Sequence, residues 1–156
     1  MAENGILKAA TIDKLPEKRF VHPFNAKAIR HTRSLGDLAG LSTLGLHLVR
    51  IEPGDETTQH HNHEYSDEFV YILSGSCTLY LDDDEHPLAA GDFVGFPARG
   101  AYHSMKNTGD DDLVYLMGGG RPEVDVGNYP RIKRRIYILS GQRESVETRH
   151  LEPLAK

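Results

Sequence analysis

The sequence predicts an all-β domain, a sandwich or a barrel, over residues 41–120. Short apolar segments rich in β-branched and aromatic residues recur in this region, separated by turn signals roughly every eight to twelve residues. No segment of the region carries an apolar stripe at i, i+3 and i+4 that is long enough for a helix. With 156 residues, the chain has the size of one domain.

The strands of this domain can be placed in order. Residues 44–51 are expected to form a strand that ends before the turn signal Pro53-Gly54. Residues 68–73 are rich in aromatic and β-branched residues and are expected to form a strand that ends at Ser74-Gly75. The acidic residues 82–85 are expected at the tip of a hairpin. The expected strands cover residues 44–51, 68–73, 77–81, 92–96 and 113–117.

Both ends of the chain are expected to extend the same domain. Residues 1–40 have weak periodicity and mixed charges, and we interpret them as an N-terminal arm that packs on the barrel and adds one or two strands. Residues 34–42 have the composition of a turn-rich connection. Residues 121–156 form a C-terminal extension, in which we expect a loop up to residue 130 and then a hairpin with its turn at Ser140-Gly141.

Composition and charge exclude several classes of protein. The formal net charge of −5 argues against a nucleic-acid partner. The chain has no signal-peptide pattern and no stretch of about 20 apolar residues, so we expect a cytoplasmic protein with no membrane partner. The single cysteine, Cys77, leaves no internal disulfide. Because residues 68–73 are apolar on both faces, a terminal arm or a second subunit must cover one face, and we expect a homodimer.

Residues 54–75 contain the clearest chemical signal. A strand places residues i and i+2 on one face, so His61 and His63 aim both imidazoles at one point, and His60 faces the other way. Glu68 opens the next strand, and an antiparallel partner would place its carboxylate beside the two imidazoles. Two nitrogen donors and one carboxylate suit a divalent metal such as Zn, Fe, Mn or Ni.

Two stretches together resemble the signature motifs of the cupin superfamily. The first motif is matched by Gly54, His61, His63, Glu68 and Gly75. The second motif is matched by Gly91, Pro97, Gly100, His103 and Asn107. Two departures stand out: the first spacer is one residue longer than usual, and the segment 97–100 holds one extra residue. Both insertions fall in loops, and all four ligand types are present.

The resemblance, which covers residues 44–117, implies a small single-domain metal-binding cupin. Its fold would be a double-stranded β-helix (jelly-roll) barrel, here with extended arms at both ends. The resemblance implies one divalent metal ion per subunit, with His61, His63, Glu68 and His103 as its ligands. The motif positions with a structural role would be Gly54, Gly75, Gly91, Pro97, Gly100 and Asn107.

A centre of three histidines and one glutamate leaves coordination positions open, which is typical of a catalytic metal. The expected walls of the barrel interior are Val70, Ile72, Leu79, Met105 and Tyr115. Met105 and Tyr115 would contact a small-molecule substrate, and Arg99 would be a cation at the rim for an anionic substrate.

These features favour a metal-dependent enzyme acting on a small oxygen-rich substrate, with sugar-phosphate isomerase-like chemistry as the best interpretation. Two alternatives stay open: a non-haem Fe(II) dioxygenase and a non-catalytic sugar-binding cupin. Fold alone does not choose among them.

Overall fold

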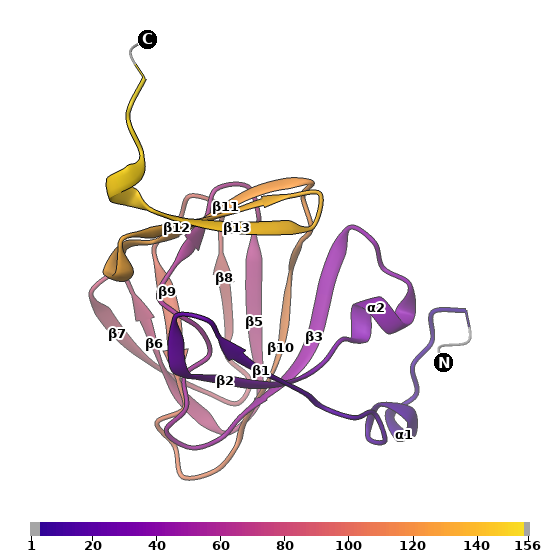
Figure 1. Cartoon of the computed structure of the whole chain (residues 1–156). Helices are drawn as coiled ribbons and strands as arrows, with labels where there is room; N and C mark the ends of the chain where they lie inside the picture. Colours follow the sequence, from indigo (N-terminus) through magenta and orange to yellow (C-terminus); the bar gives the residue numbers. More distant parts are fainter. Residues whose placement is uncertain (1–3, 155–156) are drawn as a thin grey trace.

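The structure is a computed structural model that describes residues 4–154, and nearly all of its regular structure is β-strand (Figure 1). Two short helices, α1 (Ala9–Ile12) and α2 (Leu35–Ala39), lie near the N-terminal end. The strands are β1 (Lys18–His22), β2 (Asn25–Arg33), β3 (Leu44–Ile51), β4 (Asn62–His63), β5 (Glu68–Ser74), β6 (Ser76–Leu81), β7 (Asp84–Ala89), β8 (Phe93–Phe96), β9 (His103–Lys106), β10 (Leu113–Gly120), β11 (Val124–Tyr129), β12 (Arg134–Leu139) and β13 (Gln142–Glu147).

The strands form three antiparallel sheets. The largest has six strands in the order β1-β2-β3-β10-β5-β8, the second has the order β13-β12-β11-β4, and the third has the order β7-β6-β9. This arrangement confirms the predicted all-β, double-stranded β-helix class. The expected strand at residues 44–51 is β3 itself, and the other expected core strands are β5, β6, β8 and β10.

The hydrophobic core lies between the six-stranded sheet and the three-stranded sheet. Val49, Ile72 and Tyr115 enter it from the first sheet, and Cys77 and Leu79 enter it from β6. Alternation along β5 explains this packing, since Val70 and Ile72 are buried whereas Tyr71 and Leu73 are exposed. The outer face of β5 is therefore uncovered within the described residues of one chain, and the homodimer stays a prediction.

The N-terminal arm adds two strands, as expected. The hairpin of β1 and β2 joins the six-stranded sheet through the pairing of β2 with β3, and it crosses the barrel in Figure 1. The turn-rich connection expected at 34–42 holds the short helix α2, which ends at Gly40 with φ of 83°. A glycine in the left-handed region is a common helix C-cap, so the turn signal here marks the end of a helix.

The C-terminal extension forms a sheet across one end of the barrel (Figure 1). The hairpin predicted around Ser140-Gly141 is confirmed as β12 and β13. The loop expected up to residue 130 is wrong in part, because β11 occupies 124–129 and pairs with both β12 and β4. The sequence did not predict β11, because the residues that this strand buries are Asp125, Gly127 and Tyr129 rather than aliphatic residues, so no apolar alternation is visible.

Three motif glycines occupy turns that require a left-handed backbone. Gly54, Gly75 and Gly91 have φ values of 86°, 81° and 95°. Asn107 is fully buried, and its side-chain amide donates to the carbonyl oxygens of Ile51 and Asp111, both at 2.9 Å. It ties the second motif to the end of β3. Within residues 4–154, no helix is both long enough and apolar enough to cross a membrane.

Candidate metal centre and cavity

The four predicted metal ligands come from segments of all three sheets. His61 and His103 form a β-bridge, with N–H to carbonyl oxygen distances of 3.1 and 2.8 Å, which places the start of β4 against β9. His63 ends β4 and faces Gly127 of β11, and Glu68 is the first residue of β5. Alternation along the segment 60–63 then turns His61 and His63 inward together. The site therefore depends on the packing of the whole barrel.

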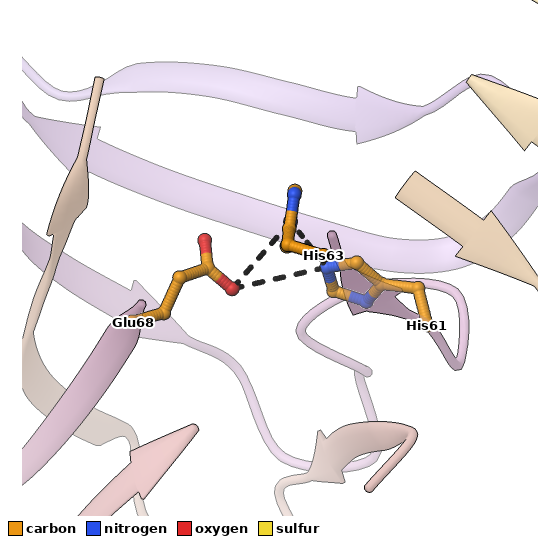
Figure 2. Close-up of side chains that lie close together, drawn as sticks. All are labelled: His61, His63 and Glu68. Atoms are coloured by element: carbon orange, nitrogen blue, oxygen red, sulfur yellow. Dashed lines mark hydrogen bonds and ion pairs between the residues drawn. The ribbon is translucent and has the colours of Figure 1, made fainter. Parts of the chain in front are cut away.

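The side chains of these residues converge on one point. The Nε2 atoms of His61 and His63 are 3.2 Å apart, and the ligand atoms of His61, His63 and Glu68 all lie within 4.8 Å of one another. Figure 2 shows the Glu68 carboxylate directed at both imidazoles; its Oε2 is 3.9 Å from His61 Nε2 and 3.6 Å from His63 Nε2. His103 Nε2 is 3.4 Å from the same oxygen.

Hydrogen bonds on the far side of each ring set the tautomers of the histidines. His63 Nδ1 lies 2.6 Å from Asp125 Oδ2, His61 Nδ1 lies 3.0 Å from the Gln59 carbonyl oxygen, and His103 Nδ1 lies 3.4 Å from the Ala101 carbonyl oxygen. These oxygens accept hydrogen bonds, so in each neutral ring the proton sits on Nδ1. All three Nε2 lone pairs then point toward the Glu68 carboxylate.

Such a set of lone pairs repels itself unless a cation lies among them. Three neutral imidazoles and one carboxylate are a donor set for a borderline divalent ion, and acceptors on the distal nitrogens are the usual supports of ligating histidines. The residues therefore fit the metal that the sequence implies. An ion held by these four residues would keep coordination positions free for water or a substrate, because the four residues face a cavity.

The pKa shifts of Glu68 and His61 agree with this assignment, whereas the hydrogen bond with Asp125 outweighs burial and raises the pKa of His63. Burial by itself would raise the pKa of Glu68, but the neighbouring imidazoles of His103, His63 and His61 favour its anionic form and lower the pKa to about 2. Burial, followed by the charge of His103, lowers the pKa of His61 well below its ordinary value. Near neutral pH the site thus presents an anionic carboxylate beside an unprotonated His61, as metal binding requires.

Aromatic rings hold two of the imidazoles in place. Phe96 stacks on His103 with ring centroids 3.8 Å apart and an interplanar angle of 9°. Tyr129 stacks on His61 at 5.2 Å and 10°. His60 lies on the other side of the strand, buried, with its Nδ1 3.2 Å from Ser104 Oγ, so it does not join the convergent group.

A cavity of about 570 Å³ opens above the four residues. Its walls come from the barrel and from both arms. Among the walls predicted from sequence, Val70, Met105 and Tyr115 line the cavity, whereas Ile72 and Leu79 are buried in the core and do not reach it. The arms contribute Phe20, His22, Phe24, Arg30, Tyr129, Ile136, Arg143, Glu144 and Ser145.

Arg99 does not line the cavity. Its side chain is 66% exposed, its Nε is 3.3 Å from a carboxylate oxygen of Glu64, and its guanidinium lies over the ring of Tyr65. A left-handed backbone at Arg99, with φ of 61°, accompanies this outward orientation. The arginines that do line the cavity are Arg30 and Arg143, which sequence reasoning missed because they lie outside the motifs.

Asp125 is the other residue of the candidate site that the sequence did not reveal. It is 3% exposed, and its Oδ1 accepts hydrogen bonds from the main-chain N–H groups of Tyr65 and Val126 while Oδ2 faces His63. The available signal was the segment VDVGNY, a strand pattern whose inward positions are polar. A buried carboxylate needs hydrogen-bond partners, and one partner of Asp125 is the candidate ligand His63.

Comparison with known proteins gives consistent matches. Residues 47–119 match the family model described as cupin domain. A solved candidate sugar phosphate isomerase from Acidithiobacillus ferrooxidans shares 41% identity, with 98% of each chain covered and a TM-score of 0.94. A sugar phosphate isomerase of the cupin superfamily from Silicibacter pomeroyi shares 29% identity, with 96% of each chain covered and a TM-score of 0.81.

Auxin-binding protein 1 of Arabidopsis thaliana is 31% identical over 136 residues, which are 81% of this chain and 65% of the plant protein. The chain thus spans less than two thirds of the length of this curated relative. The solved structures named above match it over nearly their whole length, and both arms are included in those matches.

Proposed function

This chain belongs to the cupin family, and from that premise we propose that it is a metal-dependent isomerase acting on a small sugar phosphate or a similar oxygen-rich substrate. The observation that carries the proposal is the convergence of three Nε2 lone pairs and the Glu68 carboxylate on the floor of a cavity of about 570 Å³. A cavity of this size suits a small metabolite.

Each group of residues in the site would have a distinct role. His61, His63, Glu68 and His103 would hold the ion, and Asp125 would fix the orientation of His63. A bound divalent ion supplies Lewis-acid stabilisation of negative charge that develops on a substrate oxygen during proton transfer beside a carbonyl. The apolar walls, among them Val70, Met105 and Phe96, would limit the access of water to the reacting carbons.

The comparisons support this reaction over the other chemistries of the fold. Of the two solved relatives that match nearly the whole chain, arms included, one is named a sugar phosphate isomerase and the other a candidate sugar phosphate isomerase. The arms supply much of the cavity wall, so a match that includes them bears on the substrate as well as on the fold. Binding without turnover is the second candidate, and the plant relative named auxin-binding protein 1 favours it.

The direct test is proton exchange at the substrate carbon. Protein loaded separately with Mn²⁺, Zn²⁺, Fe²⁺ or Ni²⁺ would be incubated with aldose phosphates in deuterated water, and NMR would follow ketose formation and deuterium incorporation beside the carbonyl. We expect metal-dependent turnover that falls at least about a hundredfold in His61→Ala. His86→Ala, on the exposed strand β7, is the matched control and keeps full activity. Binding of sugar phosphates with neither turnover nor exchange would support the second candidate.

A further inference from the structure

Two arginines line the cavity without an acidic partner. Arg30 on β2 and Arg143 on β13 both belong to the wall, and no ion pair joins either of them to a carboxylate within residues 4–154. Glu144, the neighbour of Arg143 on β13, also lines the cavity but pairs with neither guanidinium in the described part of the chain. The cavity wall thus carries cationic groups with unused hydrogen-bond donors.

The contrast with neighbouring residues on β2 makes this arrangement specific. Arg33 and His31 lie on the opposite face of the strand, and both are within 4 Å of the Glu17 carboxylate. Arg50, on the adjacent strand β3, contacts Glu17 and Asp112. The outer face of this sheet therefore neutralises its cations, whereas the inward-facing Arg30 has no such partner.

Arg30 is held in place by contacts that use only one of its donors, in a hydrogen bond to sulfur. Its guanidinium carbon lies 5.0 Å from the centroid of Phe20, its cross-strand partner, and Nη1 lies 3.9 Å from Met117 Sδ. Its Nε is buried and has no hydrogen-bond partner among the described residues. A guanidinium offers five N–H donors in a planar fork that matches phosphate and carboxylate oxygens. Leaving the buried Nε–H unsatisfied is unfavourable, and an anion in the cavity would satisfy it.

His22 adds a third donor to the wall of the same cavity. Its Nδ1 accepts a hydrogen bond from the Phe24 N–H at 3.2 Å, so the ring proton sits on Nε2. Burial and then the charges of Arg30 and Arg143 lower the pKa of His22 to about 4, which keeps the ring neutral near pH 7. The same two charges act on His22, and all three residues line one cavity.

We propose that Arg30, assisted by Arg143 and by the Nε2–H of His22, forms the subsite that binds the phosphate group of the substrate. This inference rests on the proposed isomerase function and adds the residues that select a phosphorylated substrate over a neutral sugar. The phosphate binds among the two arms while the sugar's oxygens reach the metal centre on the barrel floor. Arg30 is a specificity-determining residue here, not a residue of the metal centre.

Inorganic phosphate is the first probe. Metal-loaded wild-type protein, Arg30→Gln, Arg30→Lys and the control Arg33→Gln would be titrated by calorimetry, after metal content and thermal unfolding confirm that each variant is folded and loaded. We expect phosphate affinity to fall about tenfold or more in Arg30→Gln, because a charge-assisted bidentate contact is lost. The phosphate affinity of Arg30→Lys should lie between that of the wild type and that of Arg30→Gln, because lysine keeps the positive charge but not the planar guanidinium with its paired donors. Arg33→Gln should bind as the wild type does.

Equal phosphate affinity in wild type and Arg30→Gln would overturn the subsite, and it is the result expected if phosphate binds only at the metal. Steady-state kinetics supply the second readout: Arg30→Gln should raise KM for a sugar phosphate about tenfold or more while leaving KM for the unphosphorylated sugar unchanged. Phosphate binding through Arg30 without turnover would refute the isomerase and keep the subsite. Turnover that is insensitive to Arg30→Gln would refute the subsite and keep the isomerase.

Discussion

The Nδ1 atom of His63 lies 2.6 Å from Oδ2 of Asp125, a residue 62 positions further along the chain. This contact joins β11 of the C-terminal extension to the candidate metal centre on the barrel. It fixes the ring orientation of His63, leaves Nε2 free to bind a cation and makes the ligand more basic. The carboxylate is itself fixed by two main-chain N–H groups, so His63 has little freedom to rotate away.

Replacing Asp125 with asparagine should weaken metal binding about 10- to 100-fold, because the amide keeps the shape of the carboxylate but not its charge. Competition with a chromogenic chelator at pH 7 measures the affinity. Asp83→Asn, at the exposed tip of the β6–β7 hairpin, is the control and should leave the affinity unchanged. An unchanged affinity in Asp125→Asn would show that the contact does not support the metal.

Removing Glu68 and His103 together should abolish metal binding and leave the barrel folded. The Glu68→Ala/His103→Ala variant loses two of four donors that come from different sheets. Elemental analysis of freshly purified protein should show near-stoichiometric metal in the wild type and none in the variant, with similar circular dichroism spectra. A variant that still carries stoichiometric metal would mean that the ligands have been assigned incorrectly.

Stability should depend on the ionisation of Glu17, which docks the start of β1 against β3. The hydrogen bond from Arg50 lowers the pKa of Glu17 below its ordinary value of 4.5. Because the folded-state pKa is depressed, this contribution is fully present above pH 4.5 and is lost as the pH falls through the folded-state value. Glu17→Gln should therefore cost about 1 kcal/mol or less of unfolding free energy at pH 7.

The difference between Glu17→Gln and wild type should disappear in acid, when the wild-type carboxyl is also protonated. Thermal unfolding at pH 7 and at successively lower pH below 4.5 would measure it. Glu85→Gln, on the exposed strand β7, serves as the control and should match the wild type throughout. A difference that persisted after protonation would assign the effect to packing rather than to charge.

Gly75→Ala should destabilise the protein more than Gly54→Ala. Both glycines have a left-handed backbone, which costs a side chain about 1–2 kcal/mol. A Cβ at Gly75 would also lie 2.6 Å from the Asp112 carbonyl oxygen, whereas a Cβ at Gly54 meets nothing within 4 Å. Chemical denaturation of the two variants compares the effects, and equal losses would mean that backbone strain alone sets the requirement.

The sequence was sufficient to predict the barrel strands β3, β5, β6, β8 and β10 and the placement of His61 and His63 on one face, but not β7, which begins at Asp84 within the expected hairpin tip, or β9. Both predictions follow from alternation with a period of two residues, which is a local property of the chain. Val70 and Ile72 are buried while Tyr71 and Leu73 are exposed for the same reason. Glu68 and His103 could be assigned to the site only from the family motifs, because their distance from His61 and His63 depends on how the sheets pack against one another.

The residues that escaped prediction all act across long distances in the sequence. Asp125 lies on a strand that pairs with β4 through Gly127, and no local pattern specifies that register. Arg30 differs from Arg33 only in the face of β2 that it occupies, and which face lines the cavity is set by packing. Arg99 was favoured as the rim cation because it lies close to His103 in sequence, but it extends outward to Glu64.

The cavity wall has a further consequence for how specificity is distributed along the chain. The segment that matches the family model, residues 47–119, contains all four candidate ligands, whereas the two arginines lie before and after it. Under the proposed function, the metal ligands and the arginines that select a phosphorylated substrate would therefore lie in different stretches of one polypeptide. If the proposed subsite is right, substitutions of Arg30 on β2 or Arg143 on β13 would change which substrate is preferred while the four candidate ligands stay in place.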